Sequence, residues 1–157
     1  MTVESEIERS FQHQAPAGSL FETFGEQVVR RVQDVLTGRD CLYPIGVRET
    51  LVLHVLLNHR GEDRAVARAV WVQRLGIQDR ILRELVQSLR QDFGIAIGTA
   101  KDGGYFLIAT REEFDDTIRS LTLHAVTTLR VAKGMSGGHH DELLQQLRLQ
   151  LSGKEPF

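Results

Sequence analysis

Cysteine is almost absent from the chain, and long apolar runs are absent altogether. The single cysteine, Cys41, excludes an intramolecular disulfide and a CxxC-type zinc site. No apolar run approaches the roughly 18–20 residues that cross a bilayer, so neither a membrane span nor a membrane partner is expected. The N-terminal stretch MTVESEIERSFQH is acidic and polar, unlike a secretory signal or a basic transit peptide. We therefore expect a cytoplasmic protein.

The sequence also lacks a recognisable catalytic or metal-binding set. Residues 98–104 are rich in glycine, but they do not end in the GK[ST] of a phosphate-binding loop. His54 lacks the HExxH spacing that places two histidines on one helical face. Residues 139–142 (HHDE) are adjacent to one another at the start of a helix, where closed metal sites seldom form. We expect a protein that is not an enzyme and that uses no metal or cofactor.

The chain also lacks an excess of positive charge, because its formal net charge is −2. Nucleic-acid binders usually carry a positive face. The charge is nevertheless segregated, since residues 1–26 hold five acids and one base, whereas residues 60–91 hold seven arginines and four acids. Arginine is suited to bidentate contact with phosphate or guanine. A solvated helical surface has the same pattern, and both interpretations stay open.

The first part of the chain is expected to hold an arm and one helix. Residues 1–18 are polar and interrupted by Pro16, and they predict a flexible acidic arm. Ser19 is the expected N-cap and Gly38 the expected stop of the helix that follows, and residues 37–44 are a linker. The helix carries one apolar stripe with spacings of three and four: Leu20, Phe21, Phe24, Val28, Val32 and Val35.

Three helices are expected in the middle of the chain. Residues 47–58 are apolar on nearly every side, which is typical of a central, buried helix. Residues 65–75 predict a second, shorter helix, and residues 78–91 predict a third. Gly76 lies between these two, where a left-handed glycine ends a helix.

The pattern then changes to short strands and back to helix. Residues 93–98 and 105–109 are β-prone runs, joined by a glycine-rich connection that suits a hairpin. Thr110 and Glu113 form a capping box that opens a long helix to about Lys133. After the break MSGG, residues 141–151 predict a last helix. The expected fold class is mainly α with a small β-hairpin, that is, α+β.

This order of elements resembles the winged helix-turn-helix family over about residues 47–109. The stretch RAVWVQRLGIQDRILRELVQSLRQDFG is similar to a helix-turn-helix, and IAIGTAKDGGYFLIA is similar to a wing. GGYFLIATREEF is similar to the segment from wing to following helix in phage and bacterial members. The resemblance implies a winged-helix domain over residues 19–133, with its core at 47–109 and with flanking N- and C-terminal helices. Residues 139–152 would then be a C-terminal interaction helix.

The third helix of this unit has two distinct faces. At about 100° per residue, Ile81, Leu82, Leu85 and Leu89 fall within one arc of ~100°. An arc of ~80° on nearly the opposite side holds polar and basic residues: Arg80, Arg83, Gln87 and Arg90. A recognition helix needs an outer face that reaches base edges and an inner face that holds it to the core. Asp79 and Glu84 flank the outer face and would repel phosphates.

The expected DNA contacts extend beyond that helix. Gln78 and Arg80 lie at the end that usually enters the groove, and Gln73 and Arg74 precede the turn, where they are placed for backbone phosphates. Lys101 is the only base of the wing, beside Asp102. A wing that merely covers the core is an equally good interpretation.

The flanking helices predict a second kind of contact. The seam Phe114, Ile118, Leu121, Ala125 and Thr128 suits packing on a second copy of the chain, or on the apolar stripe of the N-terminal helix. The C-terminal helix carries leucines that need cover, namely Leu143, Leu144 and Leu147, and it is the better candidate for a different protein partner.

Two functions follow from these patterns. The first is sequence- or structure-specific binding of double-stranded DNA by a non-enzymatic regulator of transcription or replication of the phage or mobile-element type, acting as a homodimer or with a protein partner. The alternative is an adaptor whose winged helix recruits a partner without touching DNA. A continuous positive face across the third helix and the wing favours the first, and a broken one favours the second.

Overall fold

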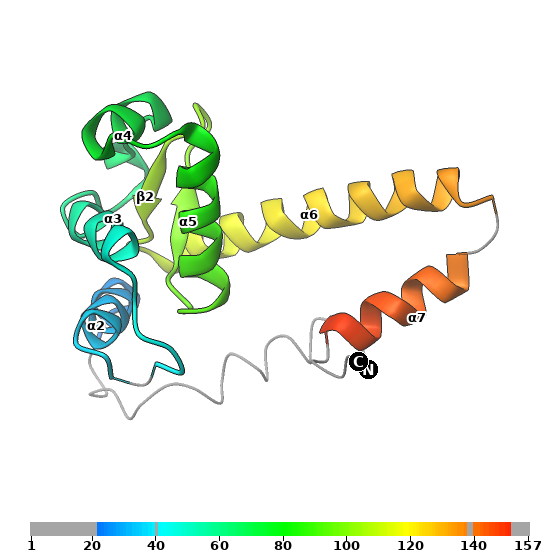
Figure 1. Ribbon diagram of the computed structural model, residues 1–157, viewed down its shortest axis with the longest axis horizontal. Coiled ribbons are helices and arrows are strands. Elements are labelled where there is room, and N and C mark those ends of the chain that lie inside the picture. Colours follow the sequence, from blue (N-terminus) through cyan, green and yellow to red (C-terminus); the bar gives the residue numbers. More distant parts are fainter. Residues whose placement is uncertain (1–21, 40, 138–139, 152–157) are drawn as a thin grey trace. The chain divides into compact units, whose positions relative to one another are not determined.

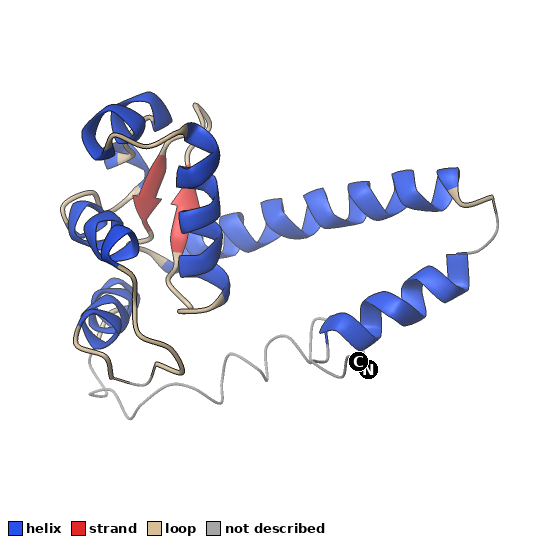
Figure 2. Ribbon diagram, in the orientation of Figure 1, coloured by secondary structure: helices blue, strands red, loops and turns tan. Residues whose placement is uncertain are grey.

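The computed structural model describes residues 22–39, 41–137 and 140–151. It is mainly helical, with one small antiparallel sheet of two strands (Figures 1 and 2). The chain divides into two compact units, Met1–Asp115 and Asp116–Phe157. The first unit contains α2 (Phe24–Leu36), α3 (Val47–Leu57), the 3-10 turn η1 (Glu62–Arg64), α4 (Arg68–Leu75), α5 (Asp79–Gln91), β1 (Ile97–Thr99) and β2 (Tyr105–Leu107). The first turn of α6 (Arg111–Met135) is the last element of this unit.

Helix α2 begins later than its sequence pattern suggests. Thr23 is the N-cap, because its side chain accepts from the Glu26 backbone N–H while the Glu26 carboxylate accepts from the Thr23 backbone N–H at 2.7 Å. These hydrogen bonds hold the pKa of Glu26 below its usual value. The expected cap at Ser19, the apolar Leu20 and Phe21, and the predicted arm all lie outside the described residues.

The core is built around α3, as its composition predicts. Val52, Leu53 and Leu56 are fully buried, and the α2 face formed by Val28, Val32 and Val35 is buried in the same core. Helix α3 packs on α2, on α5 and on β2. The helix is therefore central, although Leu51 on its outer side is half exposed.

The prediction that residues 65–75 are all helical is wrong at its first three residues. The Val66 N–H donates to the Tyr105 carbonyl at 2.9 Å, and the Tyr105 N–H donates to the Val66 carbonyl at 3.0 Å. Val66 is thereby held in extended conformation on the edge of β2, so α4 starts only at Arg68. The sequence around Val66 favours a helix, but its hydrogen bonds with Tyr105, 39 positions later in the chain, determine the conformation instead.

The connection between α4 and α5 has the predicted geometry. Gly76 adopts φ 63° and ψ 32°, the left-handed conformation that a side chain disfavours. Helix α5 then buries Leu82, Leu85, Val86 and Leu89. Trp71 of α4 is also fully buried, and its indole N–H has no hydrogen-bond partner among the residues that the structure describes.

Strands β1 and β2 form the predicted hairpin, with shorter strands than expected. Gly98 pairs with Phe106, and the Phe106 ring occupies the space that a Cβ at Gly98 would need. At the tip, the Gly103 N–H donates to the Ala100 carbonyl at 2.8 Å, and Gly103 has a φ of +84°. The hairpin therefore turns tightly through Lys101 and Asp102.

The capping box at the start of α6 is confirmed. The Glu113 N–H donates to the Thr110 hydroxyl at 3.2 Å, and the Glu113 carboxylate accepts from the backbone N–H groups of Thr110 and Ala109. The same carboxylate accepts from the Glu62 N–H, which attaches this turn to η1. Helix α6 runs to Met135, two residues beyond its expected end, and α7 (His140–Leu151) begins one residue early.

Candidate nucleic-acid interface

The outer face of α5 is formed by the residues that its periodicity predicts, with one exception. Arg80 and Arg83 leave 79% and 58% of their side chains exposed, and Gln87 is exposed as well. The buried face lies on the opposite side of the helix and fixes its rotation about its axis. Arg80, Arg83 and Gln87, called here the α5 ridge, therefore point to solvent.

Arg90 is the exception, and the prediction that it is exposed with the others is wrong. Its Nε donates to the Ile97 carbonyl at 2.9 Å, and its terminal nitrogen donates to the Thr99 hydroxyl at 2.9 Å. The guanidinium also lies 5.9 Å from the centre of the Tyr105 ring. Burial lowers the pKa of Arg90 from its ordinary value, although an arginine this basic stays charged. Arg90 therefore joins α5 to the hairpin instead of facing a ligand.

Both arginines of the α5 ridge have acidic partners. Arg80 Nε donates to Glu84 Oε1 at 2.8 Å, and this bond raises the pKa of Arg80. Arg83 Nε lies 3.2 Å from Asp79 Oδ2. The two acids that flank the ridge thus neutralise part of its charge, and the positive face is interrupted rather than continuous.

Arg68 is a third cation at this surface, and the sequence pattern did not single it out. It lies 3.7 Å from the same Asp79 carboxylate oxygen. A Cβ added at Gly103 would lie 3.5 Å from Arg68 Nε, so the guanidinium also lies against the hairpin turn. Arg68 connects the start of α5 with the tip of the hairpin. Its place in the arginine-rich stretch was the only available signal, because its contacts come from Asp79 on the next helix and from a turn 35 residues away.

The other predicted contact residues lie on the surface. Gln73, Arg74 and Gln78 are exposed at the end of α4 and the start of α5. Lys101 is exposed at the tip of the hairpin. Neither Arg74 nor Lys101 forms an ion pair within the part of the chain that the structure describes. These two cations are therefore available to an anionic ligand.

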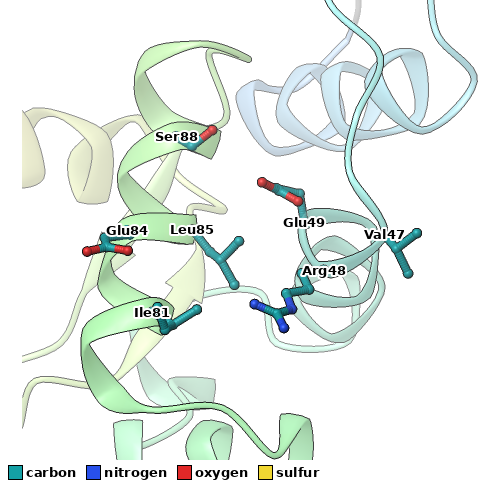
Figure 3. A pocket seen from close by; sticks show the side chains of 7 residues that line it. All are labelled: Val47, Arg48, Glu49, Ile81, Glu84, Leu85 and Ser88. Carbon is teal, nitrogen blue, oxygen red and sulfur yellow. The ribbon is translucent and has the colours of Figure 1, made fainter.

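A groove runs along α5 beside the ridge, and the sequence did not predict it. It has a volume of about 540 Å³ and lies between α3 and α5 (Figure 3). Leu85 points from α5 toward α3, and Arg48 points from α3 toward α5. The remaining lining residues are Val47, Glu49, Ile81, Glu84 and Ser88. Glu84 lines the groove and also accepts from Arg80, so the groove and the α5 ridge adjoin along the helix.

The predicted partner contacts fall into two groups. Phe114 packs on Phe24 of α2, with ring centres 5.3 Å apart. Ile118 is half-buried, whereas Leu121 and Ala125 are exposed. In α7, Leu144 and Leu147 are half-buried, and the side chain of Leu143 lies outside the described part. The α2 stripe beyond Phe24 is buried in the core with α3, so this stripe is already covered within the first unit.

Three further findings bear on function. Within residues 22–39, 41–137 and 140–151, no three His, Cys, Asp or Glu residues are grouped to hold a metal, and His139 lies outside these ranges. In the same ranges no helix has both the length and the apolar character needed to cross a membrane. The chain matches no protein-family model, no curated protein and no solved structure with which it was compared.

Proposed function

We propose that residues 47–109 form a winged helix-turn-helix unit that binds double-stranded DNA through the α5 ridge. The observation that carries the proposal is the exposure of Arg80, Arg83 and Gln87 on the side of α5 opposite its buried leucines. The order α3, α4, α5 and hairpin, with the left-handed Gly76 before α5, supports the same assignment. A regulator of transcription or replication of the phage or mobile-element type is the role that the sequence resemblance favours.

The chemistry of the ridge suits a major groove. An arginine pairs with guanine O6 and N7, and a glutamine pairs with adenine N6 and N7, each with about 1–3 kcal/mol of discrimination. Arg74 and Lys101 stand at the end of α4 and at the hairpin tip, where they suit phosphate contacts. In this proposal α5 specifies bases and its neighbours fix its position.

The ion pairs of the ridge are weak enough to exchange. An exposed pair at positions i and i+4, such as Arg80–Glu84, contributes little to stability because water screens it. A good contact between an arginine and a base is stronger than such a pair. The guanidinium groups of Arg80 and Arg83 therefore lose little when they leave Glu84 and Asp79 for DNA. The carboxylates remain nearby, however, and their repulsion of phosphate reduces the affinity.

Fluorescence anisotropy with a labelled duplex tests the proposal. We expect Arg80→Ala with Arg83→Ala to weaken binding at least tenfold and to reduce the slope of log K against log salt by roughly 1–2. Arg119→Ala is the matched control, because Arg119 is 76% exposed and pairs with Asp116 at 2.8 Å, much as Arg80 pairs with Glu84. An equal loss in the control, or an unchanged slope in the double variant, contradicts the proposal.

An adaptor is the second candidate, and the groove between α3 and α5 favours it. Val47 beside the groove is 79% exposed, and Leu42 and Tyr43 are exposed in the preceding linker. The interrupted positive face of α5 also favours a protein partner over DNA. If Val47→Ser leaves DNA binding unchanged while the ridge variant weakens it at least tenfold, the DNA-binding proposal is preferred. If purified protein binds no duplex at low salt, the adaptor replaces it.

A further inference from the structure

Helix α6 carries an apolar seam, and none of its residues is buried within the described part of the chain. Six residues beyond the first unit recur at alternating spacings of three and four: Ile118, Leu121, Ala125, Thr128, Ala132 and Met135. At about 100° per residue they fall within an arc of ~100°. No residue of α6 is buried, and Leu121 and Met135 are 47% and 83% exposed. A seven-residue apolar repeat of this kind is the signature of a helix that pairs with another helix.

The seam is separated from the charged side chains of the same helix. Asp116, Arg119, Arg130 and Lys133 all fall between about 120° and 220° from Leu121 around the helix. Leu123 lies on that charged side as well, about 200° from Leu121. A pairing helix would therefore meet apolar side chains on one side and leave the charges in water.

Charge is also divided along the length of α6. Residues 111–119 hold four acids and two arginines, whereas residues 120–135 hold two bases and no acid. Arg130 and Lys133 form no ion pair with any residue that the structure describes. Two copies of α6 in parallel would bring like charges together at both ends. An antiparallel pair would bring the acidic end of each helix toward the basic end of the other, an attraction that acts through water because these side chains lie away from the seam.

The sizes of the seam residues suit the same direction. In an antiparallel pair of heptad helices, an a position lies opposite a d position of the other helix. That register places Ile118 opposite Met135, Leu121 opposite Ala132, and Ala125 opposite Thr128. A parallel pair would instead stack Ala125, Thr128 and Ala132 on their own copies in three successive thin layers, against two at the centre of the antiparallel pair, and so leaves more space unfilled. Phe114 is not needed for this register, since it already packs on Phe24.

We propose that the occupant of the seam is a second copy of the chain, and that two α6 helices pair antiparallel through residues 118–135. The proposal does not rest on DNA binding, because the pairing requires no ligand. If the α5 ridge binds DNA, the pair would carry two such ridges.

Sedimentation of the full chain without DNA is the first test. The protein is expected to dimerise in a concentration-dependent manner, and Leu121→Asp should raise the dimer dissociation constant by roughly tenfold or more, since it places a charge in the seam. Leu123→Asp is the matched control, because the same change on the opposite face, at a leucine that is 63% exposed, should alter the constant less than about twofold. A monomer at all concentrations, as expected if α7 of the same chain covers the seam, overturns the proposal. Equal effects of the two variants also overturn it.

Crosslinking tests the direction independently of any variant that perturbs folding. In a Cys41→Ser background, Ile118→Cys and Met135→Cys proteins of different mass are mixed and treated with a short bismaleimide. Antiparallel pairing predicts crosslinks only between the two different proteins. Crosslinks of either protein with itself would show a parallel pair, and the absence of crosslinks would show a different interface; both results contradict the proposal.

Discussion

Replacing Arg90 with alanine is expected to weaken the attachment of the hairpin to α5. The guanidinium makes two hydrogen bonds of 2.9 Å, to the Ile97 carbonyl and to the Thr99 hydroxyl, and it lies over the Tyr105 ring. Hydrogen bonds with a charged partner contribute about 1.5–3 kcal/mol each when buried. Because Arg90 is only partly buried, we expect the free energy of unfolding to fall by roughly 2–4 kcal/mol.

Urea unfolding measures this loss, and the single tryptophan provides the signal. Trp71 is fully buried in the same unit, so its emission reports the unfolding of that unit directly. Arg83→Ala is the matched control, seven positions earlier on α5, where an exposed ion pair contributes at most about 0.5–1 kcal/mol. Thr99→Val removes one of the two bonds and should cost roughly 1 kcal/mol. If Arg90→Ala costs no more than Arg83→Ala, then Arg90 does not hold the hairpin.

Three further predictions concern the fold. Trp71→Phe removes an indole N–H that has no described partner and should cost less than about 1.5 kcal/mol in urea unfolding, whereas Trp71→Ala should cost roughly 3–5 kcal/mol. Gly104→Ala should lower the melting temperature, because a Cβ there would lie 2.9 Å from the Val66 carbonyl oxygen; Gly134→Ala, with no atom within 4 Å, should instead stabilise α6 by up to about 1 kcal/mol. Hydrogen bonds with Thr23 lower the pKa of Glu26 in the folded protein. The ionised Glu26 carboxylate therefore adds its full stability above its usual pKa of 4.5, and this stability is lost as the pH falls through the lowered pKa of the folded state. Glu26→Gln should remove this part of the acid dependence measured by unfolding below about pH 5.

The helices and the hairpin could be predicted because local signals agree with the tertiary contacts there. A run that is apolar on nearly every side located α3, and apolar periodicity located α5. Gly76 located the turn between α4 and α5, and the capping box located the start of α6. Prediction failed where a distant partner decided the local structure. The residues around Val66 predict a helix, yet hydrogen bonds with the Tyr105 backbone hold Val66 in an extended conformation.

The candidate site was predictable only in part for the same reason. Helical periodicity placed Arg80, Arg83 and Gln87 on the outer face of α5. Periodicity could not show that Arg90 reaches the carbonyl of Ile97, because that contact depends on where the hairpin packs. The groove beside α5 could likewise not be predicted, because it is formed by two helices that are far apart in the sequence.

A change of Glu84 to glutamine tests the central claim, that the α5 ridge binds DNA, most directly. The substitution removes a negative charge 2.8 Å from Arg80, which is itself 79% exposed. Affinity for a duplex at low salt should rise several-fold, and a gain of affinity cannot arise from misfolding. Glu142→Gln on α7 is the control, since it changes the net charge equally and should have little effect. A Glu84→Gln protein that binds duplex DNA no better than Glu142→Gln would contradict the account.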